Sequence, residues 1–139
     1  MSMTQIAFLE KSRLPSRKDL ETAISRLGYS FVFLEPFDKF EDLHDFACKI
    51  KGNETVVEMH HESAAEVLED YPAFRDKVGA ANHAISFHWG SDIAAAAAIA
   101  VLSLALIDIS NATIIYADDK MQYTREMLVA DIPAYLLQL

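Results

Sequence analysis

Apolar and polar positions along the first third of the chain predict a strand, a helix and a second strand. Short apolar runs of strand length lie at Thr4–Glu10 and Tyr29–Glu35. Between them, apolar residues recur every three or four positions, as on one face of an amphipathic helix. These residues are Leu20, Ala23, Ile24 and Leu27. Ser16 is placed to cap the start of this helix and Gly28 to end it in a left-handed conformation.

The same patterns predict further strands in the rest of the chain. Apolar positions alternate with small or polar ones through His83–Trp89, and Ala112–Ala117 is rich in branched and aromatic residues. Cys48 and Ile50 alternate with lysines ahead of Gly52-Asn53. This spacing predicts an antiparallel hairpin around a two-residue turn at Gly52-Asn53.

Capping residues predict three shorter helical segments. One carries Phe40, and a second begins at the capping pair Ser63 and Glu66. The last begins near Asp119 and runs through Leu128, after which proline is expected to end or bend it. Together these elements predict one α+β or α/β domain over residues 1–139. It would contain a mixed sheet of about six strands and five helices, which mostly cover one sheet face.

The segment from Asp92 to Asp108 has no polar face, since Ser103 is its only plainly polar residue. A transmembrane helix needs about 20 apolar residues, whereas acidic residues here bracket a shorter, alanine-rich stretch. Ser91 is expected to cap it. A fully apolar helix of a soluble protein is buried on all sides, so we expect this helix to pack on the sheet.

What covers the outer side of this helix is less clear from the sequence. Its outward stripe is expected to consist of Ala95, Ile99, Leu102 and Leu106. Because the neighbouring amphipathic helices do not obviously cover that stripe, we expect it to form the interface of a two-fold homodimer. The alternative is a monomer with this helix at its centre.

Composition excludes several classes of partner. A net charge of −9 disfavours binding to nucleic acids and to anionic membrane surfaces, because both are polyanions. One cysteine, Cys48, cannot form an internal disulfide, and the beginning of the sequence has no signal-peptide pattern. These features favour a cytoplasmic protein.

Three residues form a weak candidate metal site. In a strand through "EMHHE", Glu58 and His60 share one face, and His88 is expected on the same face of a neighbouring strand. Imidazole and carboxylate ligands suit zinc, manganese or iron, but the spacing is not that of a known metal motif. We expect an ordinary solvated sheet face and no bound metal or cofactor.

A cluster of basic residues suggests an anion site. It consists of Arg13, Ser16, Arg17 and Lys18, at the beginning of the first predicted helix. Cations are unusual in a first helical turn, whereas free backbone amides there can bind anions. The alternative interpretation is a solvated basic loop.

The sequence therefore favours a non-catalytic, dimerising protein that binds another protein, as an inhibitor or regulator does. Its acidic surface predicts a basic partner. The alternative is an enzyme or sensor for a small anionic ligand at strand-to-helix turns, with a metal-assisted version that adds Glu58 and His60. In that case Arg13 and Arg17 would hold the anion and His88 would be the acid or base.

Overall fold

A computed structural model describes residues 2–139 and has a seven-stranded sheet as its framework. The strand order is β2-β3-β4-β5-β1-β6-β7, and every neighbouring pair is antiparallel. The strands are β1 (Met3–Leu9), β2 (Phe31–Phe33), β3 (Phe46–Ile50), β4 (Asn53–Ser63), β5 (His83–Trp89), β6 (Thr113–Tyr116) and β7 (Met121–Tyr123). The α+β class is thus confirmed, with a wholly antiparallel sheet of seven strands where a mixed sheet of about six was expected.

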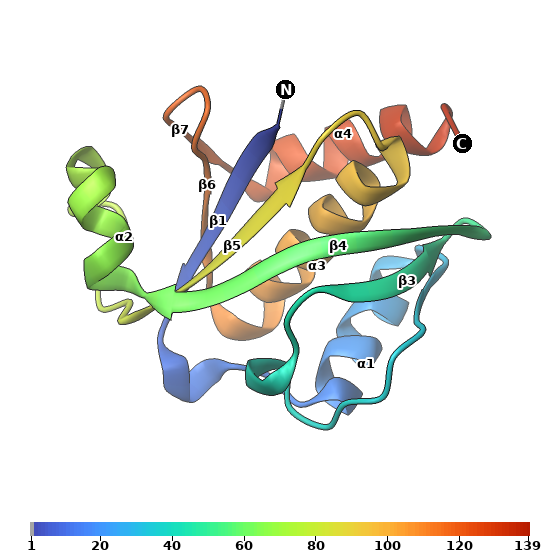
Figure 1. The fold of residues 1–139 in the computed structure, drawn as a ribbon, viewed down its shortest axis with the longest axis horizontal. Coiled ribbons are helices and arrows are strands. Elements are labelled where there is room, and N and C mark those ends of the chain that lie inside the picture. The colour runs from blue at the N-terminus through green and yellow to red at the C-terminus, as the bar shows by residue number, and fades with distance from the viewer. Residues whose placement is uncertain (1) are drawn as a thin grey trace.

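Four α-helices and three short 3-10 helices complete the described chain. The α-helices are α1 (Arg17–Leu27), α2 (Ala64–Asp70), α3 (Ile93–Ser110) and α4 (Arg125–Leu136). The 3-10 helices are η1 (Lys11–Arg13), η2 (Phe40–Asp42) and η3 (Pro72–Phe74). Helices α1, α3 and α4 lie together behind the sheet, whereas α2 stands apart at one end of it (Figure 1). The expectation that the helices mostly cover one face is confirmed.

The predicted hairpin is confirmed, but its turn lies one residue earlier than Gly52-Asn53. Ile50 pairs with Asn53, so the turn is formed by Lys51 and Gly52. Both turn residues have positive φ, 49° and 77°, as the tight turns that match strand twist require. The Asn53 side chain donates to the carbonyl oxygens of Ile50 and Lys51, which supports the turn from its second strand.

Helix α3 is buried inside the single chain. It packs against the sheet on one side and against α1 and α4 on the others. Its alanines make this possible, because small side chains let neighbouring helices approach closely. It is long and apolar enough to cross a membrane, yet 78% of it is buried within the fold, as expected of the core helix of a soluble protein.

This burial corrects the predicted dimer interface. The four residues assigned to it, Ala95, Ile99, Leu102 and Leu106, are at most 3% exposed in the single chain. They face intramolecular neighbours and cannot form a contact between two copies. The physical reason is that α1 and α4 together cover the outer side of α3, which the sequence patterns did not indicate.

The start of α3 is capped by Asp92, and Ser91, the expected cap, is exposed. The Asp92 carboxylate accepts from the backbone amides of Ala94 and Ala95, at 3.0 and 3.4 Å. It also accepts from the Thr55 hydroxyl on β4, so this one side chain joins the helix to the sheet. A carboxylate at this position also interacts favourably with the helix dipole.

The end of the chain differs most from the prediction. Residues 121–123 form strand β7 and not the start of a helix, and α4 begins only after its N-cap, Thr124. Pro133 lies inside α4 without ending it. Val129 and Pro133 lie on an exposed side of the helix, where water can satisfy the carbonyl that proline leaves unbonded.

A second, smaller core lies on the opposite face of the sheet. Helix α2 and η3 cover the apolar side chains of β1, β5 and β6 there, including Ile6, Phe8 and Ile115. The part of this face on β2, β3 and β4 has no helix over it, and Val32 and Val56 are 51% and 62% exposed. We call this uncovered part, together with the adjacent ends of β1 and β5, the open face.

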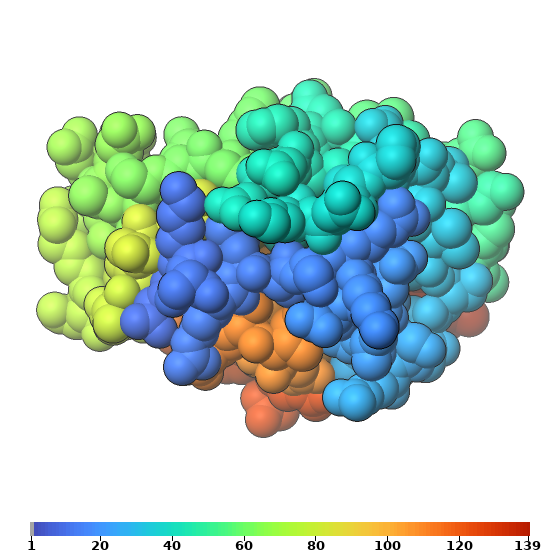
Figure 2. All heavy atoms as spheres, turned by 90° about the horizontal axis from the view of Figure 1, so that it is seen from below, coloured from blue at the N-terminus to red at the C-terminus, as the bar shows by residue number. Residues whose placement is uncertain are grey.

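The segment before α1 packs against the loop that contains η2, at one edge of the helical layer. Figure 2 shows that segment (blue) lying against the η2 loop, with the end of α3 (orange) at the surface beside it. Backbone hydrogen bonds join the two segments, from Arg17 to Asp38 and from Phe40 to Pro15. These bonds place the basic cluster at the edge of the helical layer, on the side opposite the open face.

Cys48 is fully buried in the main core, as the alternation along β3 predicted. Burial and then the nearby Asp92 raise the pKa of its thiol to about 12. The thiol is therefore protonated at neutral pH and contributes packing rather than nucleophilic chemistry.

Candidate functional site

A groove of about 520 Å³ lies between α2 and the open face. Its floor is formed by side chains of β1, β4 and β5, and its wall by α2. It is lined by Thr4, Ile6, Glu62, Glu66, Val67, Glu69, Asp70, Tyr71, Ser86 and His88. We call it the acidic groove, because four of these residues are carboxylates and none is a lysine or arginine.

Within residues 2–139, no lysine or arginine forms an ion pair with these four carboxylates. The four ion pairs found within residues 2–139 use Glu10, Glu21, Glu54 and Asp108. Only the Glu62 carboxylate has a hydrogen-bonded side-chain partner, the Ser86 hydroxyl at 3.0 Å. This bond fixes Glu62 at the groove floor, and the other three carboxylates remain available to a ligand.

The spacing of these carboxylates opposes the stability of α2. Glu66 and Asp70 are four residues apart on the helix, and Glu66 and Glu69 are three apart. Like charges at these spacings repel and destabilise a helix by about 0.2–0.5 kcal/mol per pair. Glu66, in the first turn, also interacts favourably with the helix dipole, but Glu69 and Asp70 are in the last turn, where a negative charge is unfavourable. Charges that cost local stability in this way are typical of a functional surface.

The residues of the weak metal candidate share one face, as predicted. Glu58 is paired with His88 across β4 and β5, and the rings of His60 and His88 are 5.6 Å apart. However, no group of three His, Cys, Asp or Glu side chains within residues 2–139 has an arrangement that could hold a metal ion. The three residues are thus neighbours on the sheet but do not form a metal site.

His88 lies at the end of the acidic groove, where the Thr4 hydroxyl is 3.0 Å from its Nδ1 atom. Neither Arg13 nor Arg17 approaches it, because these residues follow the opposite end of β1. The predicted pairing of two arginines with a histidine acid or base is therefore not brought together by the fold.

The residues of the predicted anion site have intramolecular partners. Arg17 donates to the Glu35 carbonyl, forms an ion pair with Glu21 and lies 5.0 Å from the Phe37 ring centroid. Ser16 accepts from the Asp19 amide, as a helix cap does. Lys18 is exposed.

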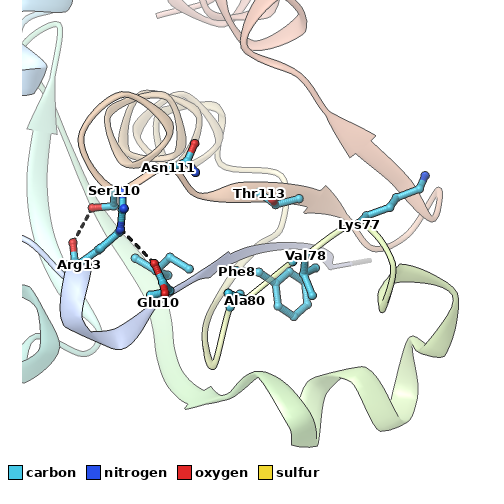
Figure 3. Close-up of a pocket in the computed structure, with 12 residues that line it drawn as sticks. Phe8, Glu10, Arg13, Lys77, Val78, Ala80, Ser110, Asn111 and Thr113 are labelled. Atoms are coloured by element: carbon cyan, nitrogen blue, oxygen red, sulfur yellow. Dashed lines mark hydrogen bonds and ion pairs between the residues drawn. The ribbon is translucent and has the colours of Figure 1, made fainter.

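Arg13 borders a separate cavity of about 260 Å³ beneath β1 and the end of α3. Figure 3 shows its guanidinium turned toward Glu10, at 3.1 Å, while the Lys77 amine points away from the cavity. The Arg13 carbonyl accepts from the Ser110 hydroxyl at 2.7 Å. The basic side chains of this region therefore do not converge on one point, and the anion site stays a prediction without a shared binding geometry.

A group of three histidines lies on the helical side of the sheet, where His83 is buried, His61 partly buried and His44 exposed. His61 Nε2 is 2.9 Å from the Leu43 carbonyl oxygen, which can only accept, so Nε2 carries the proton. His61 Nδ1 is then the acceptor of the bond from His83 Nε2, also 2.9 Å. The His44 ring packs edge-on against His61. These hydrogen bonds join Leu43, at the end of η2, to β4 and β5. With Nε2 donating and Nδ1 accepting, the His61 ring is neutral.

We expect this histidine pair to make folding stability depend on pH. Burial lowers the pKa of both His61 and His83 below 6.5. The unfolded chain therefore binds protons at a higher pH than the folded one. Stability from this source is complete above pH 6.5 and declines as pH falls through 6.5 toward the folded-state pKa values.

Urea unfolding above and below pH 6.5 checks this expectation. The double variant His61→Gln/His83→Gln should be less stable at neutral pH and less sensitive to acid. His60→Gln, on the exposed opposite face of β4, is the matched control and should keep the wild-type dependence. Equal acid sensitivity of the double variant and the wild type would contradict the role of the pair.

Two features were missed by the sequence analysis. Of the carboxylates of α2, only Glu66 was interpreted, as a capping residue, although the like-charge spacing of Glu66, Glu69 and Asp70 was a signal. The second feature is a cavity lined by aromatic residues from four separate segments, for which no sequence signal exists. These residues are Trp89, Tyr116, Tyr123 and Tyr135. Comparisons of the chain with protein-family models, with curated proteins and with solved structures find no match.

Proposed function

We propose that this protein is a non-catalytic binding protein whose acidic groove holds a basic segment of a partner protein. One observation carries the proposal. The groove between α2 and the open face is lined by four carboxylates and by no lysine or arginine, and within residues 2–139 its carboxylates form no ion pair. A cationic segment would relieve the repulsion among them and would be steered toward them by the net charge of −9.

The surroundings of the groove support the same proposal. The exposed Val32 and Val56 lie on the same sheet face as the groove but farther along it, on β2 and β4, and they give a long partner segment apolar side chains to contact. An inhibitor or regulator of a basic protein would use this surface. With its single, buried cysteine, such a protein suits a reducing cytoplasm.

The test is peptide binding with two charge-matched variants. The groove variant is Glu66→Gln/Glu69→Gln/Asp70→Asn, and the control is Asp42→Asn/Asp76→Asn/Glu126→Gln, which removes three exposed carboxylates elsewhere. The probes are peptides with different spacings of lysine and arginine, measured by fluorescence anisotropy. We expect the wild type and the control to bind the same peptides, and the groove variant to bind them about tenfold more weakly.

Equal losses in both variants would show that only net charge matters, and would overturn the proposal, as would a failure of every peptide to bind. The groove variant should also unfold at a slightly higher temperature than the wild type, since its like-charge pairs are removed. A lower unfolding temperature would mean that these carboxylates have a stabilising role.

A further inference from the structure

A further cavity, of about 410 Å³, lies where the ends of β1, β5 and β6 meet α3 and α4. It is on the helical side of the sheet, whereas the acidic groove is on the other side. Four aromatic rings line it, those of Trp89, Tyr116, Tyr123 and Tyr135. Met3 and Ile93 complete its apolar wall, and no charged residue lines it. We call it the aromatic pocket.

Three of the four rings pack in a row, and all four remain partly accessible. The Trp89 and Tyr116 centroids are 6.1 Å apart, and those of Tyr116 and Tyr123 are 5.8 Å apart. All four side chains are only partly buried. Four partly exposed rings that line one cavity leave aromatic surface available to a ligand.

Carboxylates surround the pocket without entering it. The Asp131 carboxylate accepts a hydrogen bond of 2.7 Å from the Tyr123 hydroxyl. The Asp118 carboxylate accepts one of 2.8 Å from the backbone amide of Thr4, which follows the lining residue Met3. The pKa values of Tyr116 and Tyr135 are raised, first by burial and then by these carboxylates and Asp119. The hydroxyls are therefore protonated, and the field inside the pocket favours a positive charge.

We propose that the aromatic pocket binds a methylated ammonium group. Aromatic faces attract cations, and a pocket without a carboxylate in its lining favours a weakly hydrated cation over the strongly hydrated ammonium of lysine. Cages of tryptophan and tyrosine recognise quaternary ammonium groups in this way. The group could belong to a choline-like small molecule or to a methylated lysine of a protein. The proposal does not depend on the acidic groove.

Trp89 is the chain's only tryptophan, so its fluorescence reports directly on the pocket. The first test titrates the wild-type protein with choline and with 3,3-dimethylbutan-1-ol, its neutral isostere. We expect choline to bind at least about tenfold more tightly, because only the cation is attracted by the ring faces. Equal affinities, or no binding of either compound, would overturn the proposal.

The second test assigns the source of the group and the residues. A peptide with trimethyllysine is compared with its unmodified form and with choline. Tighter binding of the peptide identifies a protein ligand, and tighter binding of choline a small molecule, and both outcomes support the cation site. Tyr116→Leu should weaken choline binding at least fivefold, while Tyr29→Leu, at a partly buried tyrosine outside the pocket, should leave it unchanged. Equal effects of the two substitutions would contradict the site.

Discussion

Replacing Leu102 with alanine is expected to lower the free energy of unfolding by about 2–5 kcal/mol, the largest effect that we predict for a single substitution. Leu102 is fully buried in the middle of α3, between the sheet and the two flanking helices. Removing its side chain leaves a cavity that rigid neighbours fill only in part. The free energy of unfolding can be measured by urea denaturation.

Two controls distinguish burial inside one chain from burial between chains. Leu137→Ala, at a position that is 84% exposed, should change stability by less than about 0.5 kcal/mol. The loss caused by Leu102→Ala should also be the same at low and high protein concentration, because the neighbours of Leu102 are intramolecular. A loss below about 1 kcal/mol, or one that depends on concentration, would contradict the packing described above.

The burial of α3 could be predicted from the sequence, but its cover could not. A helix without a polar face must be surrounded, and that inference is correct. The error lay in α4, whose apolar residues Ile132, Tyr135 and Leu136 lie at or beyond the expected end near Pro133. Because the helix continues past the proline, it covers the outer side of α3. The dimer was inferred because the outer side of α3 had no expected neighbour, and in the structure α4 packs there.

Strand β7 shows a second limit of pattern analysis. Three residues, Met121–Tyr123, are too few to establish a period of two, and the adjacent acidic residues resemble a helix start. Their extended conformation depends on pairing with β6, which is a tertiary interaction. Short edge strands of this kind are specified by their partner more than by their own residues.

The candidate sites differ in how far sequence could predict them. The common face of Glu58, His60 and His88 follows from the alternation of side chains along strands, and the register confirms it. The acidic groove requires α2 to fold back over the sheet, and the aromatic pocket joins β1, β5, β6, β7, α3 and α4. No local pattern encodes such a meeting of distant segments.

The polar residue within α3 gives the second large effect. The Ser103 hydroxyl accepts a hydrogen bond of 2.7 Å from the side-chain amide of Gln5 on β1, and both residues are buried. Ser103→Ala leaves the Gln5 amide unpaired in the core. We expect this substitution to lower the free energy of unfolding by about 1–3 kcal/mol, the cost of a buried polar group without a partner.

The complementary substitution should cost less, which makes the pair a sharp test. In Gln5→Met the Ser103 hydroxyl can still donate to the carbonyl oxygen of the preceding helical turn, so no polar group is left unpaired. The double variant Gln5→Met/Ser103→Ala removes both polar groups and should be more stable than Ser103→Ala alone. A double-mutant cycle by urea unfolding measures the coupling. If the two losses simply add, Gln5 and Ser103 do not depend on each other, and the serine in this otherwise apolar helix must be explained by something other than its contact with β1.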